Sequence, residues 1–194
     1  MQEAFRKLLA EAIGEHRVEQ ALAGLASEAS VSLRLNPFKH TDAFPLGGDG
    51  ECRPVAWSEH GRLLSGRPVF TLDPLFHAGA YYVQDSSAMY VGEQFRNLLS
   101  RLERPQDRPL RVLDLCAAPG GKTTDAAASL RAVCGDCFLL VANEIMRSRA
   151  GVLADNVAIW GDPCVAVSSL DPAAFAALPE FFDIIIADVP CSGE

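Results

Sequence analysis

Apolar and polar residues alternate with two different periods along the first part of the chain. Phe5–Ile13 and Val18–Leu25 carry apolar residues at helical spacing, with glycines near the ends of both stretches. Val31–Leu35 instead alternates between apolar and polar residues and stops before Pro37. The pattern predicts two short helices followed by a strand.

The middle of the chain has a weaker pattern. The segments 55–57 and 68–70 are expected to form short strands joined by a turn at Gly61 or Gly66, and the glycines of 47–50 are expected to form a loop.

The next segment is denser in aromatic residues. Tyr81–Val83 predicts a strand, and a helix that ends near Leu99 is expected to follow it. The candidate caps of that helix are Asp85, Ser86 and Ser87. The aromatic residues of 77–89 are expected in the core. Residues 1–80 are predicted to form a small α+β domain.

The last part of the chain repeats a strand and a helix three times and closes on a fourth strand. The strands are expected at Leu110–Leu115, Phe138–Ala142, Val165–Val167 and Phe182–Ala187, and the helices near Lys122, Ile145 and Asp171. Such a repeat predicts an α/β fold with a parallel, doubly wound sheet. The isoleucine run of 184–186 is typical of a strand covered on both faces. Residues 81–194 are therefore predicted to form a Rossmann-like domain.

The composition is that of a globular protein of 194 residues, with no apolar run near the roughly 20 residues of a membrane helix. Residues 1–7 carry Glu3 as well as Arg6 and Lys7, and no apolar core of a signal peptide follows them, so a cytoplasmic protein without membrane contact is expected. Its six cysteines should then be reduced. Cys134 and Cys137 form a single C-x-x-C with no histidine at ligand spacing, so no metal site is predicted.

The segment Asp114–Thr123 follows the first of the four strands and leads through a proline-glycine loop into an alanine-rich helix. Paired glycines let a ligand approach the backbone, and the helix N-terminus offers free N–H groups to an anion. A carboxylate or a phosphate would fit equally well, and a tight turn without ligand stays an alternative. A phosphate-binding P-loop, and with it a nucleotide triphosphatase, is disfavoured because Cys116 stands where its first glycine belongs.

Acidic residues follow the later strands, at the edge where ligands of parallel sheets bind. Glu144 comes roughly 20 positions after Gly121, the spacing at which a carboxylate meets ribose hydroxyls. Asp171 is expected either to cap the next helix or to accept a hydrogen bond from an adenine amino group. Asp188 begins a loop through Cys191, and a charged residue at the end of an isoleucine strand indicates an active site more than a packing role.

Two motifs together resemble the signature pair of the S-adenosylmethionine-dependent RNA cytosine-5 methyltransferases, the Nop/Sun family. They are Asp114-Leu-Cys-Ala-Ala-Pro-Gly-Gly-Lys-Thr123 and Asp188-Val-Pro-Cys-Ser-Gly193. The segments 77–89 and 143–156 are similar to the bacterial RsmF branch, which modifies small-subunit ribosomal RNA. The resemblance implies an RNA-binding-type domain in 1–80 and the first half of a methyltransferase domain in 81–194. It also implies S-adenosylmethionine as cofactor and RNA as partner, ribosomal RNA ahead of transfer RNA.

The resemblance implies a role for each site residue. The methionine part of the cofactor would lie against the loop, whose residues are Cys116, Ala117, Ala118, Pro119, Gly120, Gly121 and Lys122. Glu144 would hold the ribose, and Asp171 would lie near the adenine, although Ser168 and Ser169 replace the asparagines usual in this branch. Asp188 would lie where methyl donor and target base meet.

In this family a cysteine thiolate adds to carbon six of cytosine, and the activated carbon five then takes the methyl group. Cys191 would assist product release, and the nucleophilic cysteine is expected in a motif beyond Glu194. The resemblance therefore implies a fragment that binds the cofactor and is inactive alone.

The net charge of −8 is unfavourable for a nucleic-acid partner, which would need a local basic patch. Arginines gather in 96–111, where Arg104 and Arg108 are expected to be solvated linker residues. The alternative to an enzyme is a non-catalytic RNA-binding or ribosome-assembly module.

Overall fold

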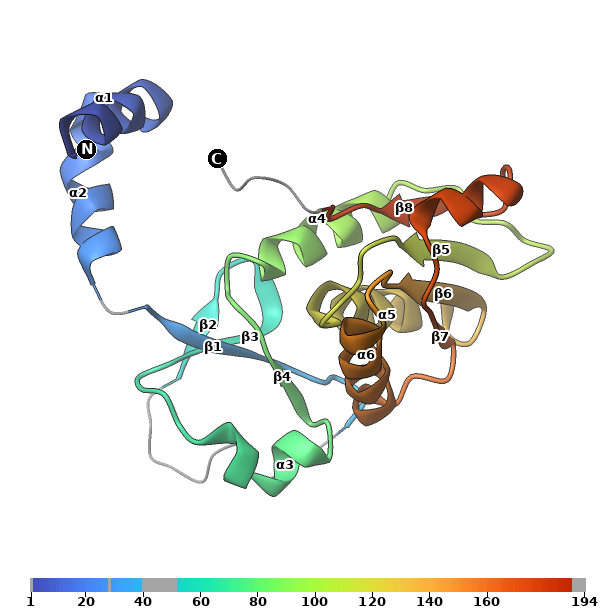
Figure 1. The fold of residues 1–194 in the computed structure, drawn as a ribbon. Coiled ribbons are helices and arrows are strands. Elements are labelled where there is room, and N and C mark those ends of the chain that lie inside the picture. The colour runs from blue at the N-terminus through green and yellow to red at the C-terminus, as the bar shows by residue number, and fades with distance from the viewer. Residues whose placement is uncertain (1, 28, 40–51, 190–194) are drawn as a thin grey trace. The chain divides into compact units, whose positions relative to one another are not determined.

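The computed structural model describes residues 2–27, 29–39 and 52–189 (Figure 1). The chain divides into two compact units, Met1–Ser30 and Val31–Glu194. Each unit is described by itself.

The first unit is a pair of helices, α1 (Gln2–Ile13) and α2 (Glu15–Ala26). Gly14, at a φ of 85°, separates them in a left-handed conformation that favours glycine. Val18 is buried between the helices, and Arg6 forms an ion pair with Glu19. The two helices predicted from apolar spacing are confirmed.

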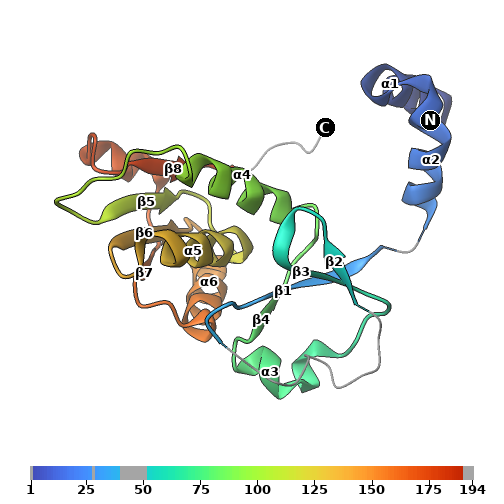
Figure 2. The ribbon, with the colours of Figure 1, turned by 180° about the vertical axis from the view of Figure 1, so that it is seen from behind.

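The second unit begins with an antiparallel sheet in the order β2-β3-β1-β4, seen from the opposite side in Figure 2. Its strands are β1 (Val31–Leu35), β2 (Arg53–Val55), β3 (Ser58–Leu64) and β4 (Tyr81–Val83). The strands predicted at 31–35 and 81–83 are confirmed. Ser32, Leu33 and Arg34 are all buried, so both faces of β1 are covered and its polar face is not solvated.

The strand positions predicted between 55 and 70 are wrong. The chain turns at Ala56–Trp57, and Gly61 lies within β3, where a Cβ would come within 2.8 Å of Met89 Sδ and Val55 Cβ. After β3 the chain forms a 3-10 turn, η1 (Phe70–Leu72), and a short helix, α3 (Pro74–His77). Gly61 therefore allows close packing within β3 and does not form a turn. The loop predicted at 47–50 lies outside the described residues.

The helix predicted after Tyr81–Val83 is α4 (Met89–Leu99). Its N-cap residue is Ala88, which makes no side-chain cap bond, so the cap predicted at 85–87 is wrong. Asp85 Oδ1 instead accepts hydrogen bonds from the backbone N–H and hydroxyl of Ser87, both at 2.9 Å. These bonds order the turn that leads into the helix.

The rest of the unit is a parallel sheet in the order β7-β6-β5-β8, which confirms the predicted α/β architecture. Its elements are β5 (Leu110–Asp114), α5 (Gly121–Cys134), β6 (Phe138–Asn143), α6 (Arg147–Trp160), β7 (Val165–Ser168), η2 (Pro172–Ala177) and β8 (Ile184–Ile186). The third crossover is a 3-10 helix and not an α-helix. Because all four strands run parallel, their carboxyl ends lie at one edge of the sheet.

The main core lies between this sheet and the helices α4 and α5. Phe95 and Leu99 of α4 join Leu130 of α5 against Val112 and Leu140 in the central strands. Burying one such side chain contributes roughly 1.5–3 kcal/mol. The core thus fixes α5 on β5 and β6, and with it the loop between β5 and α5.

The expectation that the isoleucine strand is covered on both faces is wrong. Ile184 is buried, but Ile185 on the other face is 57% exposed. Among the strands that the structure describes, β8 has one neighbour, β5.

The domain boundary predicted between residues 80 and 81 stays a prediction. β4 comes directly after it and pairs with β1, so the antiparallel sheet continues to Val83. Among the described helices, none combines the length and the apolar composition needed to cross a membrane.

Candidate cofactor site

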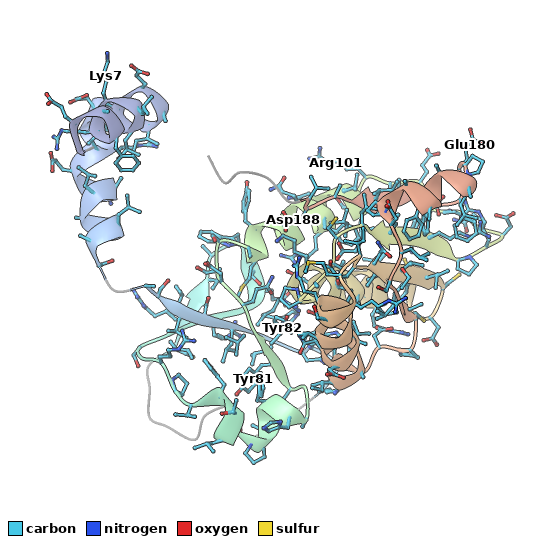
Figure 3. All side chains as sticks on the ribbon, viewed as in Figure 1. Lys7, Tyr81, Tyr82, Arg101, Glu180 and Asp188 are labelled. Atoms are coloured by element: carbon cyan, nitrogen blue, oxygen red, sulfur yellow. The ribbon has the colours of Figure 1, made fainter. Side chains whose placement is uncertain are left out.

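A cavity of about 260 Å³ lies at the carboxyl end of β5. One wall is the predicted loop with the start of α5, and the other is the segment 82–88. Tyr82 of β4 belongs to the second wall, and Asp188 after β8 also lines the cavity; both are labelled in Figure 3. The predicted cofactor residues that line it are Cys116, Ala117, Ala118, Pro119, Gly121, Lys122 and Asp188.

The loop after β5 is held in place by hydrogen bonds to its backbone. Ala117 N–H donates to the carbonyl of Asn143 at 2.8 Å, and Asn156 Nδ2 donates to the carbonyl of Pro119 at 2.7 Å. Gly120, at a φ of 109°, is the N-cap residue of α5. Because the first N–H groups of a helix have no acceptor within it, the start of α5 offers donors to an anion in the cavity.

Asp114 ends β5 and is buried beneath the cavity. Its Oδ2 accepts a hydrogen bond from Thr123 Oγ1 at 2.7 Å, whereas its buried Oδ1 has no hydrogen-bond partner. Burial raises the pKa of Asp114 to about 6, although Thr123 and Lys122 act in the opposite direction. An unpaired buried carboxylate oxygen is costly, and a ligand that brings a donor would relieve that cost.

Lys122 and Asp188 both line the cavity and form an ion pair, with Lys122 Nζ 2.6 Å from Asp188 Oδ2. Asp188 is mostly exposed, its side chain at 59%, so the pair contributes little to stability. The two groups present opposite charges to a ligand that carries both charges, such as an amino acid.

Cys116 is partly buried beside the same cavity. Burial raises the pKa of its thiol, and the carboxylates of Glu144 and Asp114 raise it further. A thiol with a raised pKa is a poor nucleophile because the thiolate is the reactive form. This environment suits a packed residue of the loop.

Glu144 is buried at the carboxyl end of β6, next to the cavity but not among the residues that line it. Its Oε1 accepts a hydrogen bond from Met146 N–H at 3.0 Å, and its Oε2 lies 3.4 Å from Arg149 Nη1. Arg149 also donates to the carbonyl of Ala118 at 2.8 Å. The predicted ribose residue is thereby tied to the loop after β5.

Asp171 caps η2, since its Oδ1 accepts a hydrogen bond from Ala173 N–H at 2.8 Å. The capping role, one of the two that the sequence left open, is present. The neighbouring segment is fixed by Asn143, whose Oδ1 accepts from Ser168 Oγ and Leu170 N–H at 2.8 and 3.0 Å. Asp171 does not line the cavity.

Six residues that line the cavity were not predicted as site residues: Tyr82, Val83, Gln84, Asp85, Ala88 and Asp114. Tyr81 is in the core as expected, with its hydroxyl on Asp73, but Tyr82 faces the loop and donates to Pro119 O at 3.1 Å. Strand alternation separates two adjacent tyrosines onto opposite faces, and this signal was available in the sequence.

Several other predictions concern residues around this site. Cys191 lies outside the described residues. Within the parts that the structure describes, no group of three or more His, Cys, Asp or Glu side chains could hold a metal ion. Arg104 is exposed, as predicted for a solvated linker residue, and donates to Val133 O at 2.7 Å. Arg108 is partly exposed and binds both carboxylate oxygens of Asp183.

Comparisons with known proteins agree with this fold. Residues 1–86 match the family described as the N-terminal domain of 16S rRNA methyltransferase RsmF, and residues 101–194 match 16S rRNA methyltransferase RsmB/F. The chain is similar to a methyltransferase homologue from Pyrococcus horikoshii, with a TM-score of 0.71 at 24% identity over 93% of this chain and 56% of that one. The similarity to NSun6 from the same organism has a TM-score of 0.65 at 14% identity and covers 96% of this chain and 70% of that one. At these sequence identities the structural similarity shows a shared fold and nothing more.

Curated relatives carry the name ribosomal RNA small subunit methyltransferase F. The protein of Pectobacterium atrosepticum is 38% identical over 84% of this chain and 33% of its own length. The protein of Serratia proteamaculans is 38% identical over 84% of this chain and 34% of its own length. The chain thus spans about a third of the length of these relatives. The two family matches together cover most of the sequence, and with the 38% identity to these relatives they place the chain in the RsmB/F family of 16S rRNA methyltransferases.

Proposed function

We propose that the cavity at the carboxyl end of β5 binds S-adenosylmethionine, as the methyl donor for carbon five of a cytosine in ribosomal RNA. Membership of a methyltransferase family supports both the cofactor and the class of reaction. The name of the relatives supports ribosomal RNA as the substrate. The position on carbon five rests on the paired motifs around Cys116 and Cys191.

The observation that carries the proposal is the unpaired Oδ1 of Asp114 beneath the cavity. The methionine end of the cofactor has an ammonium and a carboxylate group. The ammonium group would donate to Asp114 Oδ1 and to Asp188, which relieves the buried oxygen. The carboxylate would accept from the first N–H groups of α5 and from Lys122. The residues present therefore fit the zwitterionic end of this cofactor.

The remaining contacts follow the carboxyl edge of the sheet. Glu144 would accept hydrogen bonds from the ribose hydroxyls with Oε2, which is held by Arg149 at a long 3.4 Å. Asp171 would lie toward the adenine while its Oδ1 continues to cap η2. The cavity of about 260 Å³ is below the usual range of roughly 300–1,000 Å³ for whole ligands, which agrees with a pocket for the methionine part.

Bound S-adenosylmethionine supplies an electrophilic methyl group. Asp188, exposed beside the cavity, would orient the target cytosine at that group. Cys191 would assist release of the product, and the nucleophilic cysteine would come from a motif that follows residue 194. We propose accordingly that these 194 residues bind the cofactor without transferring its methyl group.

Calorimetric titration with S-adenosylhomocysteine and with ATP tests the site. Wild type is expected to bind the first ligand and not the second, and Asp114→Asn and Glu144→Ala are expected to weaken binding at least about tenfold, the loss of one charged hydrogen bond. Asp155→Asn, an exposed carboxylate of α6, is the control and should bind as wild type. Binding of ATP alone would favour the nucleotide triphosphatase.

A methylation assay on RNA tests the second part. No transfer is expected from the 194-residue chain. Methylation that is lost in Cys191→Ala would contradict the proposal and make Cys191 the nucleophile. Equal RNA binding with and without cofactor, together with no response to S-adenosylhomocysteine, would instead support the assembly module.

A further inference from the structure

A buried arginine of the antiparallel sheet reaches both walls of the proposed cofactor cavity. Arg34 in β1 is 1% exposed. Its Nε donates to Gln84 Oε1 at 2.9 Å, and its Nη2 donates to Thr124 Oγ1 at 2.6 Å and to the carbonyl of Gly121 at 3.2 Å. Gly121 and Gln84 line the cavity from opposite sides. One side chain thus joins β1, the segment after β4 and the first turn of α5.

Arg34 is buried at a cost that its surroundings only partly offset. Burial lowers the pKa of Arg34, while Asp125, whose Oδ2 is 3.7 Å from Nε, raises it. The guanidinium carbon lies 4.7 Å from the ring centre of Trp160, a cation–π contact. A buried ion pair is seldom the most stabilising solution for a core, so the arrangement points to a need for defined geometry.

The partner of Arg34 is itself confined by close packing. Asp125 also binds Arg96 at 3.2 Å, and a Cβ on Gly92 of α4 would come within 2.1 Å of Asp125 Oδ2. Glycine at position 92 is therefore what lets the carboxylate lie beside Arg34. Several elements hold the guanidinium in one orientation.

The fixed guanidinium determines which way the amide of Gln84 faces. Arginine can only donate hydrogen bonds, so the Gln84 oxygen must face Arg34 and the Nε2 amino group must face away from it. Nε2 lies 3.4 Å from where a Cβ of Gly121 would be, at the start of α5. The amino group of Gln84 consequently adds N–H donors on the wall that faces the first N–H groups of α5.

We infer that Gln84 is a binding residue for the carboxylate of the cofactor and that Arg34 is the positioning residue that orients it. The inference rests on the proposed cofactor site. With Arg34 in place, Gln84 and α5 donate from two sides to the same carboxylate. Without it, the Gln84 amide is free to turn its oxygen toward the ligand, where it would repel a carboxylate.

Two ligands separate this role from a structural one. S-adenosylhomocysteine has the amino-acid end and 5′-methylthioadenosine lacks it. Gln84→Glu keeps the shape and strengthens the pairing with Arg34 but places a negative charge at the cavity. Arg34→Lys keeps the charge and loses the fork. Both variants are expected to lower the affinity for S-adenosylhomocysteine about tenfold or more, as one lost charge-assisted hydrogen bond implies. The affinity for 5′-methylthioadenosine should stay within about twofold of wild type.

The control is Arg131→Lys, at the other end of α5, where Arg131 binds Asp162 and stacks on Phe138. It should change the affinity for neither ligand. If folded Gln84→Glu binds S-adenosylhomocysteine as wild type does, or loses both ligands equally, the inference is overturned. If Arg34→Lys does not fold, Gln84→Glu decides alone. If wild type does not bind S-adenosylhomocysteine, the proposed cofactor site fails and the inference with it.

Discussion

Both ends of the parallel sheet carry charged residues, but the carboxylates at the two ends differ in how fully they are hydrogen-bonded. At the amino end, Asp162 accepts from Arg131 with both oxygens, at 3.0 and 2.6 Å, and Asp183 accepts two bonds from Arg108 and one from Arg111 N–H. At the carboxyl end, Asp114 has an oxygen without a hydrogen-bond partner.

The difference shows how to tell a structural charge cluster from a binding site. The carboxylates at the amino end have their charges compensated by arginines within the chain, and their pairs join α5 and β8 to the sheet. The carboxyl end leaves a buried acceptor, a raised carboxyl pKa and the start of a helix around a cavity. Charge by itself does not indicate a ligand. Asp125 Oδ2 also lacks a hydrogen-bond partner but lies 3.7 Å from Arg34 Nε, so a ligand at Asp114 is indicated by the unpaired oxygen together with the cavity and the helix start.

The largest expected effect on stability is at the amino end. Asp162→Ala removes the buried partner of the mostly buried Arg131 and leaves it only the exposed Asp136, so it should lower the free energy of unfolding by about 3 kcal/mol, measured by urea denaturation. Asp136 also pairs with Arg131 but is 91% exposed, so Asp136→Ala should cost less than about 1 kcal/mol. Equal losses in the two variants, or a changed affinity for S-adenosylhomocysteine, would contradict a purely structural amino end.

A smaller effect of opposite sign is expected at the carboxyl end. The pKa of Asp114 is about 6 in the folded chain, against about 4 in an unfolded one, so the folded state binds the proton more tightly. Its contribution to stability is full below about pH 4 and is lost as the pH rises through about 6. Asp114→Asn should therefore be more stable than wild type at pH 8, by about 2 kcal/mol.

Thermal unfolding of Asp114→Asn and wild type at pH 4 and pH 8 checks this expectation. The gap between the two proteins should close at the lower pH. A gap that is the same at both values would mean that the buried charge is not its cause. The same variant should bind S-adenosylhomocysteine more weakly, so at this end stability and binding move in opposite directions.

The smallest effect is expected from Arg108→Ala, at the amino end. Arg108 lowers the pKa of Asp183, so the pair stabilises the chain above the ordinary carboxyl pKa of about 4 and loses its effect as the pH falls through the lowered value. The variant should melt slightly below wild type at pH 7 and together with it in strong acid. A difference that persists in acid would point to lost packing of the arginine stem.

Local patterns predicted most elements of the fold, and their failures have physical causes. The parallel strands were predictable because apolar runs and helix-forming segments alternate within short windows. Gly61 was misread as a turn because its role, room for Met89 and Val55, depends on side chains distant in the sequence. Ile185 was expected to be buried because β-branched residues indicate a strand but do not say what covers each face.

The sequence by itself determined the loop from Cys116 to Lys122 and the acidic residues at the strand ends, because chain direction and strand order place these segments at one edge. Only the tertiary structure brought in Arg34 and Gln84, which are 50 residues apart, and set Arg34 against Gly121 and Thr124, 87 and 90 residues away. The alternation in β1 predicts a solvated polar face, and packing against α5 buries it instead. Which polar groups are left unpaired is a property of the packed structure, and no local pattern records it.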